Sequence, residues 1–491
     1  MNNNHFRSLF NGKRTSLNFN YSIRRGGSVL LALKAGVLYL VALMLSFSSC
    51  IQGFDNEMNF TSGVENTTLE SPNAEDVTFN PSADGLTMKI VWPVVYGAGG
   101  YQFSLYIVDD PENPVAVGIE NEIVDGCSVS RDYLEDTKYM AVLKTLGSEK
   151  YNNKEATSAT DVNYSTLLIA TIIPDGTDLT QYFTENPITD AGEELGYELV
   201  AGGTYTVSDE INFGTAYVTL RGDKIDPPTV TMNAGFKAQG GGTKFKFINF
   251  ECSGIPTDGM FFGFTDIPDG AELVNSAVMV TNPIVFQSCN FVGLPVPLYW
   301  DNGKNYLPYT LLIKNCVVEM TNNGRVIRNS TSNGGIKDFT ATNSTFYKNN
   351  TGKDYWMQFS GTRLEKFGIA SGSQNYKNCT FYGFDRMHNS NNYSRKYISV
   401  SIESCIFLEM LREPTARYIL PSGNNRNISL TYDNNTYWRE GAVENYGSYD
   451  KSGTTLDEDP LCADPASGNF TVGNSNTVAA GIGDPRWLSV Q

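Results

Sequence analysis

The segment Lys377-Asn-Cys-Thr-Phe381 decides the fold of this chain, because its five-residue pattern recurs along the C-terminal half. The first copy is Lys246-Phe-Ile-Asn-Phe250 and the last is Asp433-Asn-Asn-Thr-Tyr437. Four further copies are Gln287-Ser-Cys-Asn-Phe291, Lys314-Asn-Cys-Val-Val318, Thr342-Asn-Ser-Thr-Phe346 and Glu403-Ser-Cys-Ile-Phe407. Successive copies begin 26 to 41 residues apart. A pattern that returns at this period predicts a solenoid, and loop insertions account for the uneven spacing.

The aligned copies form columns, and each column has a physical reason. The second column contains Phe247, Ser288, Asn315, Asn343, Asn378, Ser404 and Asn434. Asn accepts the left-handed backbone of a sharp bend, and stacked amides can bond between neighbouring coils. The third column contains Ile248, Cys289, Cys316, Ser344, Cys379, Cys405 and Asn435, and the fifth contains Phe250, Phe291, Val318, Phe346, Phe381, Phe407 and Tyr437. Before the bend, a further apolar column contains Phe286, Ile313, Ala341, Tyr376, Ile402 and Tyr432. Alternate apolar positions on both sides of a bend predict inward-facing side chains on two strands. The chain is therefore predicted to be all-β, and residues 173–455 to form a right-handed parallel β-helix that resembles the pectin lyase fold.

The cysteines fit the same scheme. Four of the eight occupy the third column, where a free thiol behaves as a small apolar side chain. Neighbours in a parallel stack point the same way, which disfavours a disulfide framework. No Cys or His spacing indicates a metal site, so none is expected. The state of Cys127, Cys252 and Cys462 stays open, including a bridge among them.

Residues 1–49 have the composition of an export signal. Six basic residues and no acidic residue fall in this stretch, and Ala35–Phe47 is an apolar run of signal-peptide length. Ser48-Ser49-Cys50 follows and resembles the lipobox of bacterial lipoproteins, so Cys50 is the expected lipidation site. The alternative is a plain signal peptide followed by a free cysteine. Residues 50–72 are polar and acidic and are predicted to be a tether. We therefore expect an exported protein that is lipid-anchored at Cys50.

Residues 73–172 alternate apolar and polar side chains in the manner of β-strands. The setting of Trp92 before a proline and a glycine-rich turn, together with the Leu134 and Tyr139 spacing, resembles a fibronectin type III module. The resemblance implies that Trp92 is a core residue and that Tyr139 is a corner tyrosine, and such a module is expected to act as a spacer. At the ends of the β-helix, residues 177–183 are predicted to form a capping helix and residues 456–491 a closing segment.

Three further segments carry a more specific resemblance: Glu198–Tyr205, Val218–Asp223 and the ending Gly483-Asp-Pro-Arg-Trp487. They are similar to uncharacterised Bacteroidetes lipoproteins, a domain-of-unknown-function family that pairs a fibronectin type III-like module with a pectin-lyase-like right-handed β-helix. The resemblance implies an outer-membrane or cell-surface location and a place in polysaccharide utilisation, of pectin especially. An outer-membrane glycan transporter complex is the expected partner. It supplies no catalytic residues.

Charge is distributed unevenly along the chain. Removing residues 1–49 leaves 30 basic against 53 acidic residues, a net charge of −23, which argues against a nucleic-acid partner. Residues 321–420, however, contain 13 Lys and Arg residues and only seven Asp and Glu residues. This local excess is the strongest functional signal in the sequence. The alternative is that these charges only decorate outward positions of strands.

The sequence offers little for catalysis. Glycoside hydrolysis needs two carboxylates at a defined separation, and the Asn-Thr-Asp and Gly-His-Gly motifs of polygalacturonases are missing. A polysaccharide lyase needs a base, for which Arg386, His388 and Lys396 are the candidates. Calcium would be the expected cofactor of a lyase, and otherwise no cofactor is expected.

One set of side chains suggests a binding groove. If Ile327, Met357 and Met387 face inward, an outer face is shared by Arg328, Trp356, Gln358, Arg386 and His388, with Trp300 nearby. Aromatic rings stack on sugars and arginine pairs with carboxylates, so these six residues are the predicted carbohydrate-binding site. A slip of one residue would turn them inward. The favoured hypothesis is a non-catalytic lipoprotein that binds an anionic plant polysaccharide. The alternatives are a polysaccharide lyase and a structural or adhesion protein.

Overall fold

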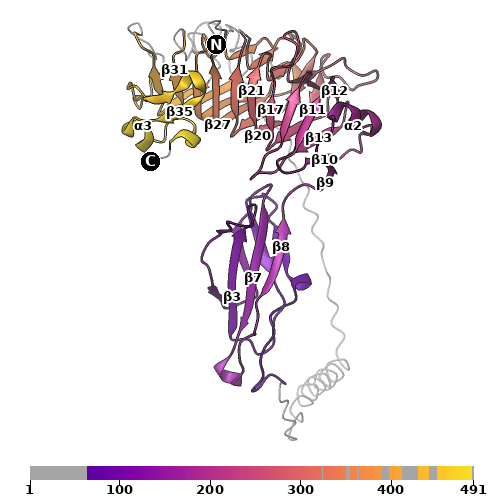
Figure 1. Ribbon diagram of the computed structural model, residues 1–491, viewed down its shortest axis with the longest axis vertical. Coiled ribbons are helices and arrows are strands. Elements are labelled where there is room, and N and C mark those ends of the chain that lie inside the picture. Colours follow the sequence, from indigo (N-terminus) through magenta and orange to yellow (C-terminus); the bar gives the residue numbers. More distant parts are fainter. Residues whose placement is uncertain are drawn as a thin grey trace, which may run out of the picture.

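The computed structural model describes residues 63–322, 324–349, 354–361, 364–388, 398–411, 429–441 and 450–488. The predicted signal segment, Cys50 and most of the predicted tether lie outside these residues. Within them the chain is nearly all β, with an antiparallel part followed by a right-handed parallel β-helix (Figure 1). None of the helices in the described ranges has the length and apolar character needed to cross a membrane.

The antiparallel part contains two sheets. One is formed by β1 (Thr78–Pro81), β2 (Thr87–Val91) and β6 (Ser128–Asp132), and the other by β3 (Gly100–Ile107), β4 (Val115–Ala116), β5 (Glu122–Val124), β7 (Lys138–Leu146) and β8 (Thr160–Ser165). The 3-10 turns η1 (Ala74–Asp76) and η2 (Glu149–Tyr151) flank these strands. Trp92 is buried and stacks on Phe103 at 5.6 Å between ring centroids. The Leu134 N–H donates to the hydroxyl of buried Tyr139 at 2.9 Å. Trp92 is therefore a core residue, as expected, and Tyr139 is buried and bonded to the backbone five residues earlier.

The end of the predicted tether packs on the antiparallel part instead of standing free. Leu69 is buried, and its N–H donates to the Lys154 carbonyl at 3.0 Å. The Ser71 hydroxyl donates to the Ser158 carbonyl. The expectation of a tether as far as residue 72 was therefore wrong for this end, which buries Leu69 and bonds to the antiparallel part.

The β-helix is built from three parallel sheets. The first contains β9 (Ala170–Ile173), β10 (Glu194–Leu199), β13 (Tyr217–Arg221), β16 (Thr243–Lys246), β20 (Ile284–Gln287), β24 (Thr310–Lys314), the first halves of β27 (Asp338–Lys348) and β29 (Gly372–Tyr382), β30 (Ile398–Glu403) and β32 (Ser429–Asp433). The second contains β11 (Thr204–Val207), β14 (Thr229–Met232), β17 (Asn249–Glu251), β21 (Asn290–Leu294), β25 (Val317–Met320), the second halves of β27 and β29, β31 (Ile406–Leu408) and β33 (Thr436–Trp438). The third contains β12 (Ile211–Asn212), β15 (Phe236–Ala238), β18 (Phe262–Phe264), β22 (Tyr299–Trp300), β26 (Ile327–Asn329) and β28 (Met357–Phe359). Outside them, β19 (Val278–Val280) pairs with β23 (Tyr306–Pro308), and η3 spans Leu364–Phe367. Strand β9 already belongs to the coil, so the coil begins ahead of the expected boundary at residue 173.

The bend between the first and second sheets explains the repeated pattern. Every residue of the predicted bend column has a left-handed backbone, with φ between 49° and 58°. Amides bond along this column, for example from Asn315 Nδ2 to Ser288 Oγ at 3.0 Å and from Asn434 Nδ2 to Ser404 Oγ at 3.1 Å. The residues of the third and fifth columns are all buried, and Phe346, Phe381, Phe407 and Tyr437 stack in a row with centroids 5.1–5.4 Å apart.

All seven cysteines in the described part of the chain are free, so the question of a bridge among Cys127, Cys252 and Cys462 is answered.

A short helix covers the start of the coil, and the closing segment packs along the side of the coil. At the start, α2 (Leu179–Glu185) begins at the N-cap Asp178 and buries Leu179 and Phe183 in the coil core, as the sequence predicts. At the other end, the closing segment contains β34 (Cys462–Asp464), η6 (Pro465–Ser467), β35 (Asn469–Val472), α3 (Ser475–Ala479) and η7 (Pro485–Trp487). It lies against the outside of the last coils, where Phe470 contacts the rings of Tyr347 and Tyr382 (Figure 1).

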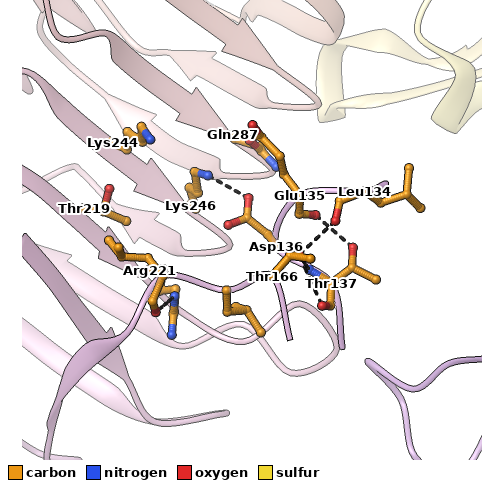
Figure 2. Close-up of polar contacts among 12 residues, drawn as sticks. Leu134, Glu135, Asp136, Thr137, Thr166, Thr219, Arg221, Lys244, Lys246 and Gln287 are labelled. Atoms are coloured by element: carbon orange, nitrogen blue, oxygen red, sulfur yellow. Dashed lines mark hydrogen bonds and ion pairs between the residues drawn. The ribbon is translucent and has the colours of Figure 1, made fainter. Parts of the chain in front are cut away.

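The two parts of the molecule meet through ion pairs. Lys246 on β16 donates to Asp136, in the loop between β6 and β7, at 2.6 Å (Figure 2). Both side chains are less than a tenth exposed. Lys224 pairs with Asp109 at 2.7 Å beside them. The antiparallel part is thus joined to the start of the coil by charged groups that the sequence alone did not single out.

Candidate functional site

The third sheet carries a column of polar and aromatic side chains on its outer face. Trp300, Arg328 and Gln358 are direct neighbours on β22, β26 and β28. The alternate residues Tyr299, Ile327 and Met357 are fully buried. Because strand side chains alternate, this register turns the first three outward. These three predicted site residues are therefore brought together on one surface.

A buried carboxylate positions the tryptophan. The Trp300 indole N–H donates to Ser330 Oγ at 2.9 Å, and that hydroxyl donates to Asp301 at 2.6 Å. Asp301 also accepts from Asn329 Nδ2 and from the backbone N–H groups of Ser330 and Thr331. Its charge is therefore satisfied by the turn after β26. The Arg328 guanidinium lies over the Trp300 ring, 4.0 Å from its centroid, which is a close cation–π contact.

Two residues outside the predicted set complete this surface. The Tyr355 ring contacts two guanidinium groups, that of Arg325 at 5.7 Å and that of Arg386 at 5.1 Å. Arg325 also donates to Gln358 Oε1. We call Trp300, Arg325, Arg328, Tyr355, Gln358 and Arg386 the arginine strip. Arg325 and Tyr355 flank β26 and β28, and their link to the site was visible in the sequence only as the local excess of basic residues.

Charge within the arginine strip is only partly neutralised. Arg325 pairs with Asp354 at 3.1 Å and Arg386 pairs with Asp385 at 3.2 Å. None of the ion pairs within the described ranges includes Arg328, and its Nε is buried with no acceptor among those residues. Burial and then the nearby positive charge of Arg325 lower the pKa of Arg328 from its usual value. An anion at this place would relieve both costs.

Two predicted site residues lie inside the coil, and the expectation was wrong for both. Trp356 is fully buried among Phe346, Tyr376 and Phe381, with centroid distances of 5.1–5.6 Å. It precedes β28, where the alternation has not yet begun. His388 pairs with Met357 across the sheet and shares its inward column, so the register is one residue away from the one expected.

The environment of His388 also changes its chemistry. The side chain is fully buried, and Nε2 lies 2.9 Å from the Tyr376 hydroxyl. Burial lowers its pKa to about 3. A group with this location cannot reach a polysaccharide, so His388 is removed from the candidate bases. Arg386 is buried against Asp385, and Lys396 lies outside the described residues.

Among the residues that the structure covers, no three His, Cys, Asp or Glu side chains lie close enough to hold a metal ion.

Comparisons with known proteins match the chain in three pieces. Residues 25–202 match the model of a domain of unknown function (DUF4992), residues 203–349 that of a second (DUF4957) and residues 375–487 that of a third (DUF5123). The expected similarity to domains of unknown function is confirmed. The first match runs past the antiparallel part and into the first coil, as far as the turn after β10. No curated protein matches the chain.

Proposed function

We propose that this protein is an outer-membrane or surface lipoprotein that binds an anionic, pectic polysaccharide through its arginine strip. One observation carries the proposal. Arg328 is stacked on Trp300, is partly buried and has no carboxylate partner among the described residues. A guanidinium in this state offers paired donors to a uronate carboxylate, and the neighbouring ring offers a face to the sugar.

The size of the expected effect follows from general energetics. A hydrogen bond to a charged group contributes about 1.5–3 kcal/mol when the partner is well placed. Salt would weaken the attraction, since the strip is partly exposed. The overall negative charge of the protein has the opposite effect and would repel polyanions elsewhere on the surface. Binding is therefore expected to depend on the arginine strip and not on the molecule as a whole.

The remaining features suit presentation of such a site. Export and acylation at Cys50 would attach the chain to a membrane, as in the Bacteroidetes lipoproteins that the sequence resembles. The antiparallel part, read as a fibronectin type III-like spacer, would hold the coil away from the bilayer. A glycan transporter in the same membrane is the expected partner.

The test is affinity electrophoresis of the purified mature protein in gels that contain polygalacturonate. We expect retardation that decreases with added salt. The affinity of the Arg328→Ala variant should fall by about tenfold or more, because the arginine strip loses its unpaired donor group. Lys89→Ala is the matched control, since it removes one exposed positive charge from the antiparallel part.

Two results would overturn the proposal. Equal retardation of Arg328→Ala and the wild-type protein would show that the arginine strip does not bind the polysaccharide. No retardation by polygalacturonate would show that the protein does not bind this anionic ligand. Ultraviolet absorbance is recorded in parallel. A rise in absorbance from unsaturated uronates would show that the protein is a polysaccharide lyase and not only a binding protein.

A further inference from the structure

A second groove lies on a different face of the coil, outside the second sheet. Its volume is about 270 Å³. The floor is formed by β14, β17, β21 and β25, whose outward residues include Asn249, Asn290 and Val317 in one row. Glu251 and Val292 form the next row. With strands about 4.8 Å apart, four strands give a floor roughly 14 Å long.

Aromatic side chains close one end of this groove. Tyr347 from β27 and Trp487 from η7 both line it. Trp487 belongs to the closing segment, so its position depends on how that segment attaches to the coil. This motif at the end of the sequence has no role in the arginine strip.

A short chain of hydrogen bonds holds Trp487 in place. Its indole N–H donates to Thr345 Oγ1 at 2.8 Å, and the same hydroxyl donates to Asp484 Oδ2 at 2.8 Å. Asp484 is almost fully buried and caps η7 by accepting from the Arg486 N–H. Both the donor and the acceptor capacity of Thr345 are therefore used to orient the ring. Trp487 is a fixed wall and not a freely rotating surface residue.

The floor presents hydrogen-bonding groups in a regular array. Asn290 Nδ2 donates to Asn249 Oδ1 at 2.7 Å, and Asn249 Nδ2 donates to the Pro227 carbonyl at 3.4 Å, which leaves Asn290 Oδ1 and the second Nδ2 hydrogen of Asn290 for a ligand. Val292, the direct neighbour of Glu251 in the next row, is 53% exposed. Burial and the charge of Glu319 raise the pKa of Tyr347 to about 12, so its hydroxyl stays a donor.

We infer that this groove binds an uncharged saccharide chain. Rings at one end can cover the apolar face of a sugar, and amide and carboxylate groups along the floor can bond to its hydroxyls. None of the residues that line the groove is Lys or Arg, and Glu251 is exposed within it. A uronate chain would be repelled here, so the two faces of the coil differ in the glycans they accept. This site does not depend on the arginine strip.

The test uses the mature protein and soluble uncharged polysaccharides as probes: galactomannan, arabinan, xyloglucan and hydroxyethyl cellulose, each in affinity electrophoresis. We expect retardation by at least one probe. The double variant Glu251→Gln/Asn290→Ala should lose that retardation by tenfold or more and keep its binding to polygalacturonate. Glu272→Gln is the control, since it removes one exposed carboxylate in a loop elsewhere.

A second readout locates the ligand. The probe that retards the protein should change tryptophan fluorescence in the wild type, and the Trp487→Phe variant should lose this change while keeping the packing against Phe470. Failure of all four probes to bind overturns the inference. So does binding that the double variant retains. Loss of polygalacturonate binding in Arg328→Ala with neutral binding intact would separate the two sites.

Discussion

At the scale of single residues, the position of a residue in its strand, and not its type, decided which side chains face solvent. Trp356 and His388 have the chemistry of a sugar site, yet both are packed in the coil core. Arg328, in contrast, lies on the outward side of β26, next to Gln358 of β28. A difference of one position in register separates these outcomes, because side chains alternate along a strand.

The buried imidazole makes a prediction about pH. Above pH 6.5 His388 is neutral in both the folded and the unfolded chain. Between pH 6.5 and its folded pKa of about 3, only the unfolded chain binds the proton, so stability is lost as the pH falls through this window. The slope from this group approaches about 1.4 kcal/mol per pH unit.

The His388→Gln variant tests this prediction, since glutamine can still bond to Tyr376 without titrating. Urea unfolding of both proteins between pH 4 and 7.5 should give a flatter stability profile for the variant. The difference between the two profiles removes the contribution of carboxylates that both proteins share. Parallel profiles would contradict a neutral, buried His388.

At the scale of elements, the bend column sets the shape of each coil. Strand β27 turns from the first sheet to the second at Asn343, where φ is 49°. This backbone costs an ordinary L-residue roughly 1–2 kcal/mol, and a β-branched residue more. Asn and Ser bear it at six of the seven positions in the column.

Substitution at the bend should therefore be sensitive to shape. Asn343→Val is expected to lower the free energy of unfolding by about 2 kcal/mol, and Asn343→Gly should change it little. Thr340→Val in the extended part of the same strand is the control, because valine suits that backbone. Denaturant midpoints measure all three. Equal losses for both valine variants would show that the bend imposes no special cost.

At the scale of the whole molecule, the ion pair between Lys246 and Asp136 couples the antiparallel part to the coil. Removing one partner of a buried pair leaves an uncompensated charge and costs about 3–5 kcal/mol. The molecule can avoid this cost by separating its two parts, which exposes Asp136 to water. Lys246→Met is therefore expected to increase the maximum dimension in small-angle scattering or to lower the unfolding midpoint.

Two further variants complete this test. Adding Asp136→Asn to Lys246→Met removes the buried charge and should restore most of the loss, and asparagine accepts the left-handed backbone at this position. Lys304→Met breaks a far more exposed pair with Asp266 and should cost less than about 1 kcal/mol. A Lys246→Met protein with unchanged scattering and stability would rule out this coupling.

The sequence by itself determined the coil, because its repeated bend, cysteine and phenylalanine columns each report one local backbone geometry or one buried position. It also determined the capping helix and the burial of Trp92, which depend on short-range patterns. Only the tertiary structure decided the site. Which of Arg328, Trp356 and His388 face outward depends on the register between strands some 30 residues apart, and the wall at Trp487 depends on contacts with Thr345 more than a hundred residues earlier. Local patterns cannot fix such pairings, since a shift of one residue leaves the composition of each strand unchanged and reverses its faces.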